Sequence, residues 1–120
     1  MDISITSIGN VHVVNLKGRF TLGPPVDEFR STTDALMKDG NARFVIGLSE
    51  VPTMDSSAIG AIVRLTATSK KANGDVKLVA PSKMVIQTLK IVGLLNLFAI
   101  YDTDQAAAQS YVHANAAPGA

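Results

Sequence analysis

Residues Val45–Ile62 have the sequence VIGLSEVPTMDSSAIGAI, and this stretch decides the fold. Its first residues belong to an almost unbroken apolar run, Phe44–Leu48. Such a run is typical of a strand covered on both faces, as in a parallel or mixed sheet. Pro52 prevents an early helix start and keeps the following loop extended. The stretch therefore predicts a buried strand, a short polar loop and a helix.

The predicted helix begins at polar residues. Asp55 or Ser56 provides a side-chain oxygen for the unpaired N–H groups of the first turn. From Ile59 onward the apolar residues recur at helical spacing, which predicts one face packed against the sheet. The two hydroxyls of Ser56 and Ser57 thus lie at a helix N-terminus, where phosphoryl groups and other anions are tolerated.

The composition narrows the range of functions. A chain of 120 residues with 47% hydrophobic and 18% charged residues is typical of one globular domain with a real core. A formal net charge of +1 and scattered basic residues give no electrostatic reason to expect nucleic acid as a partner. The absence of cysteine excludes disulfides, thiol catalysis and cysteine-ligated metals.

The sequence shows neither a secretory signal nor an apolar run long enough to span a membrane. The first residues, MDIS, lack the basic and apolar segments of a secretory signal. No apolar run reaches the roughly 18 residues that a membrane span needs. We therefore expect a cytoplasmic protein that does not insert into a membrane.

The rest of the chain predicts alternating strands and helices in the order β-β-α-β-α-β-α-β-α. All the strands are predicted to belong to one mixed, mostly parallel sheet. Its first two strands form an antiparallel hairpin around Gly9–Asn10. In the second strand, Val11–Lys17, the apolar positions change parity, which indicates either a bulge or burial on both faces. The predicted organisation is one α/β domain over residues 1–113, followed by a frayed tail over residues 114–120.

The loop after the second strand carries two large apolar residues, Phe20 and Leu22, among glycines and prolines. One interpretation is that both side chains pack into the core. The other is that they form a patch that faces a partner. The sequence alone leaves both interpretations open.

The segment Met54–Gly60, MDSSAIG, resembles the signature of STAS domains, and specifically of the bacterial anti-sigma factor antagonists. Their pattern is an apolar strand, a short loop, and Asp-Ser-Ser/Thr-Gly-Leu-Gly at the start of a helix. The chain departs from it at Ala58, where the family usually has glycine. The resemblance runs from the first hairpin to the last helix, and it implies a small sheet with helices packed mainly against one face.

The resemblance implies a phosphorylation site at Ser56, with Ser57 as the fallback. It also implies that Asp55 caps the helix and orients the Ser56 hydroxyl, and that Gly60 lets the helix approach a neighbouring element. The residues alone favour the simpler explanation that Asp55, Ser56 and Ser57 are helix caps, which contribute ~1 kcal/mol each at most. The family resemblance favours the phosphorylation site instead. Ala58 adds a Cβ that we expect to hinder close approach by a kinase.

The partners implied by the resemblance are an anti-sigma factor that is itself a serine kinase and supplies the ATP, and a serine phosphatase. The unphosphorylated chain would bind the kinase and free a sigma factor, and phosphorylation would cancel binding. The expected contact surface contains Phe20, Thr21, Leu22 and Met54. The oligomeric state is left open.

The residues do not support an enzyme, a metal site or a cofactor. A serine nucleophile needs a base, and the only histidines are His12, on a strand, and His113, near the end of the chain. Neither a Gly-x-Ser-x-Gly elbow nor a phosphate-binding Gly-x-x-x-x-Gly-Lys loop occurs. His12 has no second ligand at a useful spacing for a metal.

Two other functions remain compatible with the sequence. One is a STAS subunit of a transporter or signalling assembly that is never phosphorylated, and Ala58 favours it. The other is a small-ligand module that uses the helix N-terminus as an anion site, for which no specific residue argues.

Overall fold

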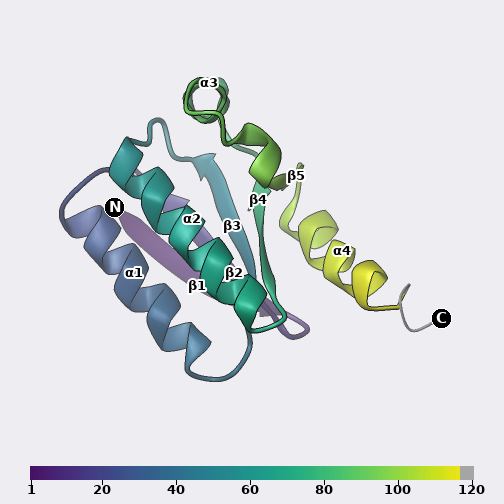
Figure 1. Ribbon diagram of the computed structural model, residues 1–120. Helices are drawn as coiled ribbons and strands as arrows, with labels where there is room; N and C mark the ends of the chain where they lie inside the picture. The colour runs from purple at the N-terminus through teal and green to yellow at the C-terminus, as the bar shows by residue number, and fades with distance from the viewer. Residues whose placement is uncertain (117–120) are drawn as a thin grey trace.

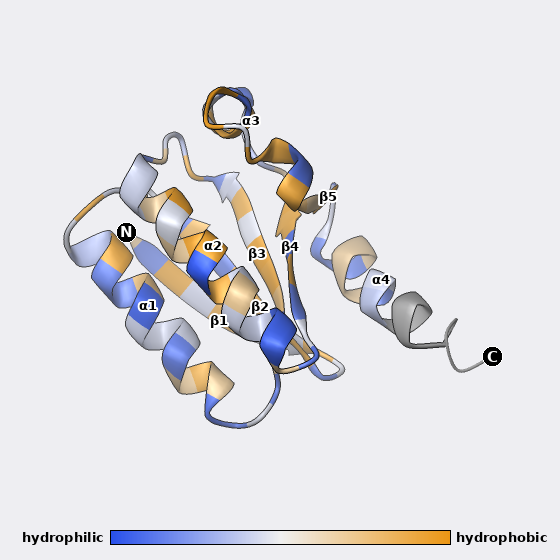
Figure 2. Ribbon diagram, viewed as in Figure 1, coloured by the Kyte–Doolittle hydropathy of each residue, from blue (hydrophilic) through white to orange (hydrophobic). Residues whose placement is uncertain are grey.

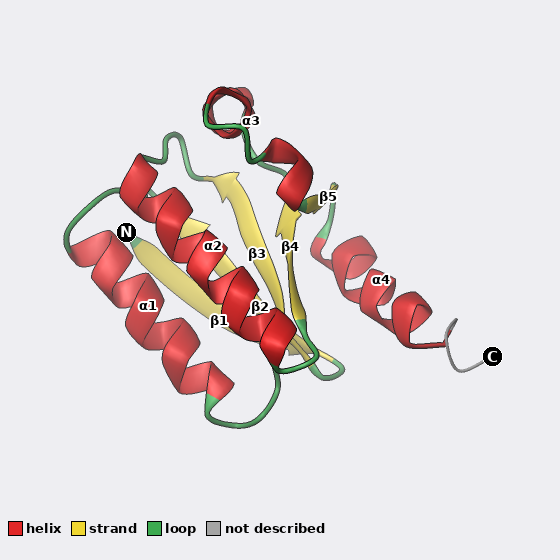
Figure 3. Ribbon diagram, in the orientation of Figure 1, coloured by secondary structure: helices red, strands yellow, loops and turns green. Residues whose placement is uncertain are grey.

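Five strands form one sheet in the order β1-β2-β3-β4-β5, and four helices pack around it (Figures 1 and 3). The computed structural model describes residues 1–116. Strands β1 and β2 are antiparallel, and the other neighbouring strands are parallel. The predicted mixed α/β sheet and its order of elements are thereby confirmed. The strands are β1 (Asp2–Ile8), β2 (Val11–Lys17), β3 (Arg43–Glu50), β4 (Asp75–Val79) and β5 (Ala99–Tyr101); the helices are α1 (Pro24–Met37), α2 (Ser56–Lys71), α3 (Lys83–Ile91) and α4 (Asp104–Ala116), with a 3-10 turn η1 (Leu95–Leu97) before β5.

The sheet has an unequal hydrophobic core on each face. Helices α1 and α2 lie side by side across one face, and α4 covers part of the other (Figure 1). The larger core joins α1 and α2 to side chains such as Phe44 and Ile46 of β3. The smaller one joins α4 to Val13 and Val45. Because β3 supplies buried side chains to both cores, its sequence is an apolar run rather than an alternating one.

Strand β2 settles the parity question by being buried on both faces. Val11 and Val13 belong to the core under α4, whereas Val14 and Leu16 belong to the core under α1 and α2. The shift in its pairing with β3 lies between Asn15 and Lys17, after the change of parity from Val13 to Val14. Burial on both faces, rather than a bulge, therefore explains the change of parity.

The C-terminal boundary of the domain stays a prediction. Helix α4 is described as far as Ala116, beyond the expected boundary at residue 113. Residues 117–120 of the predicted frayed tail lie outside the described residues.

Tyr111 ties α4 to the centre of the sheet. Its hydroxyl donates to the carbonyl oxygen of Phe44 at 2.7 Å and accepts from the N–H of Phe44 at 3.3 Å. The ammonium of Lys77 lies 5.0 Å from the centre of the tyrosine ring and pairs with Asp75 at 3.7 Å. Burial, and then the charge of Asp75, raise the pKa of Tyr111, so the hydroxyl stays a donor at neutral pH.

Replacement Tyr111→Phe should lower the free energy of unfolding by about 1–3 kcal/mol, because it leaves two buried polar groups of Phe44 without their partner. Urea unfolding followed by circular dichroism measures this loss. Tyr101→Phe is the matched control, since Tyr101 is half-buried beside the same core. Equal losses in the two variants would contradict the anchoring role of Tyr111.

Candidate functional site

Ser56 is the first residue of α2 and is exposed at the end of the sheet where the parallel strands finish. The loop that leads to it, from β3 to α2, is fixed by burial of Val51 and Met54. Its hydroxyl is thus presented on an ordered helix start rather than on a free loop. The sequence placed Ser56 at this junction correctly.

The loop before α2 is paired with the loop that follows β2. The N–H of Phe20 donates to the carbonyl of Thr53 at 3.1 Å, and the N–H of Asp55 donates to the carbonyl of Phe20 at 3.3 Å. These bonds form a short parallel bridge between Phe20 and Met54. The start of α2 and the segment that enters α1 are therefore held together by backbone pairing.

The same pairing buries two of the residues that were expected to contact a partner. Phe20 is fully buried, with its ring 5.0 Å from the ring of Phe29, and Met54 is buried as well. Their side chains belong to the core, so the expectation that they face a partner is corrected by their burial. Leu22 is 73% exposed and Thr21 half-buried, so these two residues remain available.

Asp55 is the helix cap, which decides between Asp55 and Ser56. Its Oδ1 accepts from the N–H of Ala58 at 3.0 Å, and its Oδ2 accepts from the N–H of Leu22 at 2.8 Å. These two donors, that of Leu22 first, hold the pKa of the Asp55 carboxyl below its ordinary value. One carboxylate therefore joins the start of α2 to the segment before α1.

Asp55 was expected to orient the Ser56 hydroxyl, but within the described part of the chain that hydroxyl donates no hydrogen bond to the Asp55 carboxylate. Both carboxylate oxygens instead accept backbone N–H groups. Ser56 is exposed and Ser57 half-buried, so the two hydroxyls differ in accessibility. Asp55 thus positions the backbone around Ser56 rather than its hydroxyl.

Ala58 and Gly60 take positions opposite to those expected. Ala58 is fully buried, so its Cβ faces the core and does not obstruct a partner at the surface. Gly60 is exposed, and a Cβ added there would meet nothing within 4 Å. The burial of Ala58 removes the steric reason for expecting it to hinder a kinase, and the open space at Gly60 contradicts the expectation that this glycine permits close helix packing.

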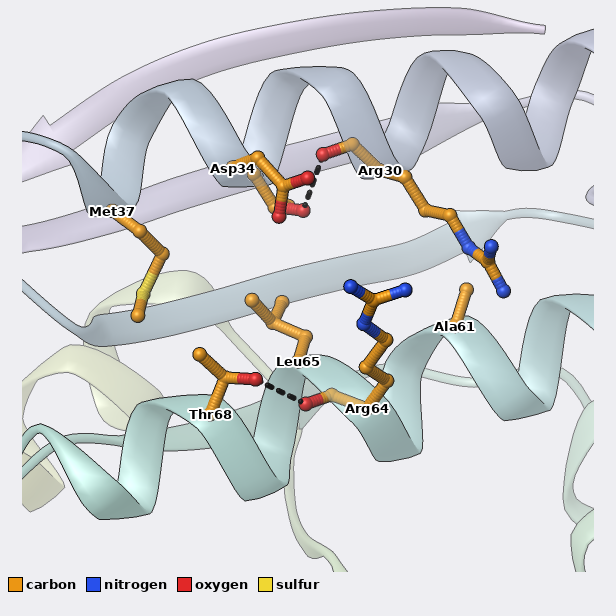
Figure 4. A pocket seen from close by; sticks show the side chains of 8 residues that line it. Arg30, Asp34, Met37, Ala61, Arg64, Leu65 and Thr68 are labelled. Atoms are coloured by element: carbon orange, nitrogen blue, oxygen red, sulfur yellow. Dashed lines mark hydrogen bonds between the residues drawn. The ribbon is translucent and has the colours of Figure 1, made fainter.

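A small cavity between α1 and α2 lies apart from Ser56 (Figure 4). Its volume is about 90 Å³, and Arg30 and Arg64 reach into it from the two helices. The hydroxyls of Thr33 and Thr68 on its wall are bonded to carbonyls of their own helices. This cavity is too small for a nucleotide.

Among the side chains that the structure describes, no group of three or more acidic or histidine residues is arranged to hold a metal ion. His12 is half-buried and packs on Phe44, with the ring centres 5.2 Å apart. Among the described helices, none has the length and apolar character to cross a bilayer.

Comparison with known proteins now assigns the family. The STAS domain family model matches residues 2–107. The chain belongs to the STAS domain family. A protein of Thermotoga neapolitana, named as a predicted anti-sigma factor antagonist, is 31% identical over 70 residues, which span 58% of this chain and 62% of the relative.

Solved structures of this family share the fold. A predicted anti-sigma factor antagonist of Thermotoga maritima matches with a TM-score of 0.83 and 21% identity, covering 90% of this chain and 92% of the other. The anti-sigma factor antagonist SpoIIAA matches in its unphosphorylated form with a TM-score of 0.73 and 18% identity, covering 93% and 98%. Its phosphorylated form, from Bacillus, has the same TM-score at 17% identity, covering 92% and 99%.

The sequence did not predict the bond between Asp55 and the N–H of Leu22. These residues are far apart in the chain, and no local pattern announces a backbone donor at Leu22. The one available signal was Gly23-Pro24, which marks the turn into α1 and places Leu22 at its start. Gly23 adopts a φ of 102°, a conformation that favours glycine.

Replacement Asp55→Ala should lower the free energy of unfolding by about 1–2 kcal/mol, because two backbone N–H groups lose their acceptor. Asp55→Asn keeps one acceptor oxygen for the cap and should lose less. Urea unfolding at neutral pH measures both variants. A cost of Asp55→Asn equal to that of Asp55→Ala would contradict the capping role.

The pH dependence of stability should also change at Asp55. A carboxyl whose folded pKa lies below the unfolded value stabilises the fold above about pH 5, and this contribution disappears as the pH falls below about 4. The difference in unfolding free energy between the wild type and Asp55→Asn should therefore shrink in acid. Unfolding curves recorded from above about pH 5 to below about pH 4 measure this difference. A difference that stays constant with pH would refute the prediction.

Proposed function

We propose that this STAS protein is an anti-sigma factor antagonist switched off by phosphorylation of Ser56. The unphosphorylated chain binds a serine-kinase anti-sigma factor and frees a sigma factor for transcription. The observation that carries the proposal is that Ser56 is exposed at the first residue of α2 while its neighbours Met54 and Asp55 are held in place. We assign no catalytic step to the chain and place it in the cytoplasm.

The electrostatics of the junction suit a switch. A phosphate on Ser56 adds about −1.5 to −2 charges. The positive end of α2 favours that charge, and the ionised carboxylate of Asp55 opposes it. Since Asp55 rather than Ser56 makes the cap, phosphorylation removes no bond of the fold. We expect the fold to survive and the surface to change.

The change has to be large enough to release the partner. A ~100-fold weaker complex corresponds to about 2.7 kcal/mol. Burying a dianion without a partner charge at an interface supplies a penalty of this order. SpoIIAA, solved in phosphorylated and unphosphorylated forms, gives a precedent for a phosphorylated protein with this fold. A serine phosphatase would restore binding.

The contact surface that we propose is the start of α2 together with Thr21 and Leu22. The side chain of Leu22 is 73% exposed, so a partner that covers it gains the free energy of burying apolar surface. The backbone N–H of Leu22 donates to Asp55, the neighbour of Ser56, so Leu22 lies next to the proposed phosphorylation site. A phosphate on Ser56 would therefore act where the partner makes contact.

The rival function, an unphosphorylated STAS subunit of a transporter or signalling assembly, loses its main argument. Ala58 was its only support in the sequence, and the Cβ of Ala58 faces the core. The two functions still differ in one measurable property, which is phosphate incorporation at Ser56.

Incubation of the chain with ATP and the anti-sigma-type serine kinase from the same genome should add one phosphate by intact mass. The phosphate should disappear in Ser56→Ala, because the exposed hydroxyl is the acceptor. Ser57→Ala is the matched control and should keep the added mass. No added mass with a kinase active on another substrate, or a loss confined to Ser57→Ala, would overturn the assignment of Ser56.

Replacement Leu22→Ala should weaken binding to the kinase about 10-fold, or about 1.4 kcal/mol, because its exposed side chain is covered in the complex. Calorimetric titration of the kinase with each variant measures the change. Ile91→Ala is the matched control, since Ile91 is 75% exposed but lies on α3. Equal affinities for Leu22→Ala and the wild type would remove Leu22 from the surface.

A further inference from the structure

Most of the large apolar side chains that are exposed in the described chain lie in or beside helix α3, turn η1 and strand β5. Two of the exposed side chains, Ile91 and Met84, are 75% and 59% accessible. Figure 2 shows these consecutive elements largely in orange, with α3 at one end of the molecule. Of the seven large apolar side chains that are exposed within the described residues, five lie here: Met84, Ile91, Val92, Leu97 and Ile100. Such a concentration marks a surface that meets another apolar phase.

The core does not account for these side chains. Helix α3 already packs on the core through Val85 and Leu89, which are buried. Met84 and Ile91 lie seven residues apart, hence on one side of α3 and away from those two residues. Val92, directly after α3, is 45% exposed as well. Helix α3 therefore has a second apolar side that nothing in the described chain covers.

The charged side chains of α3, η1 and β5 are all lysines. Residues 76–101 contain three lysines and no aspartate or glutamate, and Asp75 and Asp102 lie directly before and after them. Lys77 is paired with Asp75, whereas Lys83 and Lys90 are exposed and form no ion pair within the described residues. Lys83 and Lys90 are also seven residues apart, each beside an exposed apolar residue of α3. A row of cations thus runs next to a row of apolar side chains.

We propose that this α3–β5 surface, made by Lys83, Met84, Lys90, Ile91 and Leu97, docks on an anionic lipid bilayer. Apolar side chains that enter the headgroup region, together with lysines that meet anionic headgroups, are the combination that holds peripheral proteins on membranes. The contact is peripheral, because α3 has only nine residues and spans nothing.

A second copy of the chain suits this surface less well. In a symmetric dimer the same patch faces itself, and because residues 83–101 contain lysines and no acidic residue, the patch of the second copy would offer no carboxylate to Lys83 and Lys90. An anionic bilayer offers the opposite charge and a deformable apolar layer to the same side chains. The proposal goes beyond the proposed function, because it uses neither Ser56 nor the surface around Leu22.

The test is cosedimentation of the full chain with vesicles. Binding is expected to vesicles of phosphatidylcholine mixed with phosphatidylglycerol, and at least ten times weaker binding to phosphatidylcholine alone. The double variants Lys83→Glu/Lys90→Glu and Met84→Gln/Ile91→Gln should each reduce binding at least tenfold. All four positions are exposed and the new side chains are compatible with a helix, so circular dichroism should be unchanged.

Two matched controls separate this surface from general effects. Lys70→Glu/Lys71→Glu makes the same change of charge at the end of α2, and Leu22→Gln makes a similar apolar-to-polar change elsewhere. Both should bind vesicles as the wild type does. Absence of binding to the anionic vesicles, or an equal loss in a control, would overturn the proposal. A second result would also overturn it: the wild type forms a dimer in light scattering, Met84→Gln/Ile91→Gln abolishes the dimer, and the vesicles are not bound. The surface would then join two copies of the chain.

Discussion

The arrangement of this domain around Ser56 depends on one carboxylate. Asp55 accepts an N–H from Ala58 inside α2 and another from Leu22 at the entrance to α1. Helices α1 and α2 cover the same face of the sheet, so this carboxylate fixes their starts relative to each other. The two backbone donors also lower the pKa of Asp55, which keeps the acceptor ionised at neutral pH. Helix capping and tertiary contact are thus provided by the same side chain.

Local signals in the sequence predicted the elements that have local causes. The apolar run Phe44–Leu48 predicted β3, and the structure confirms it. Helix α3 likewise has local signals at both ends, a serine cap at Ser82 and a glycine at Gly93. Ser82 accepts from the N–H of Val85 at 3.2 Å, and the N–H of Leu94 reaches back to Leu89 at 2.9 Å. Each of these features involves residues fewer than six positions apart, so the sequence contains the whole interaction.

The side-chain directions at the site depended on contacts that the sequence does not display. The bridge between Phe20 and Met54 pairs two loops that are distant in the chain, and it is this pairing that buries both residues. The direction of the Ala58 side chain, in contrast, follows from the helical spacing of the sequence alone. Ala58 lies four and seven residues before Ile62 and Leu65, which are buried on the same side of α2. The family pattern has glycine at this position, but the helical period already directs Ala58 toward the core.

Because Asp55 rather than Ser56 caps α2, the proposed phosphorylation of Ser56 would cost the fold little stability. A serine that capped the helix would have its oxygen bonded to the backbone, and a phosphate on it would have to break that bond. Here Asp55 occupies the cap, and the Ser56 hydroxyl is exposed without a bond to Asp55 within the described residues. A phosphate on Ser56, as we propose, would therefore break no bond of the helix cap. It would change the surface, since the added charge would lie beside Leu22, whose N–H donates to the same carboxylate.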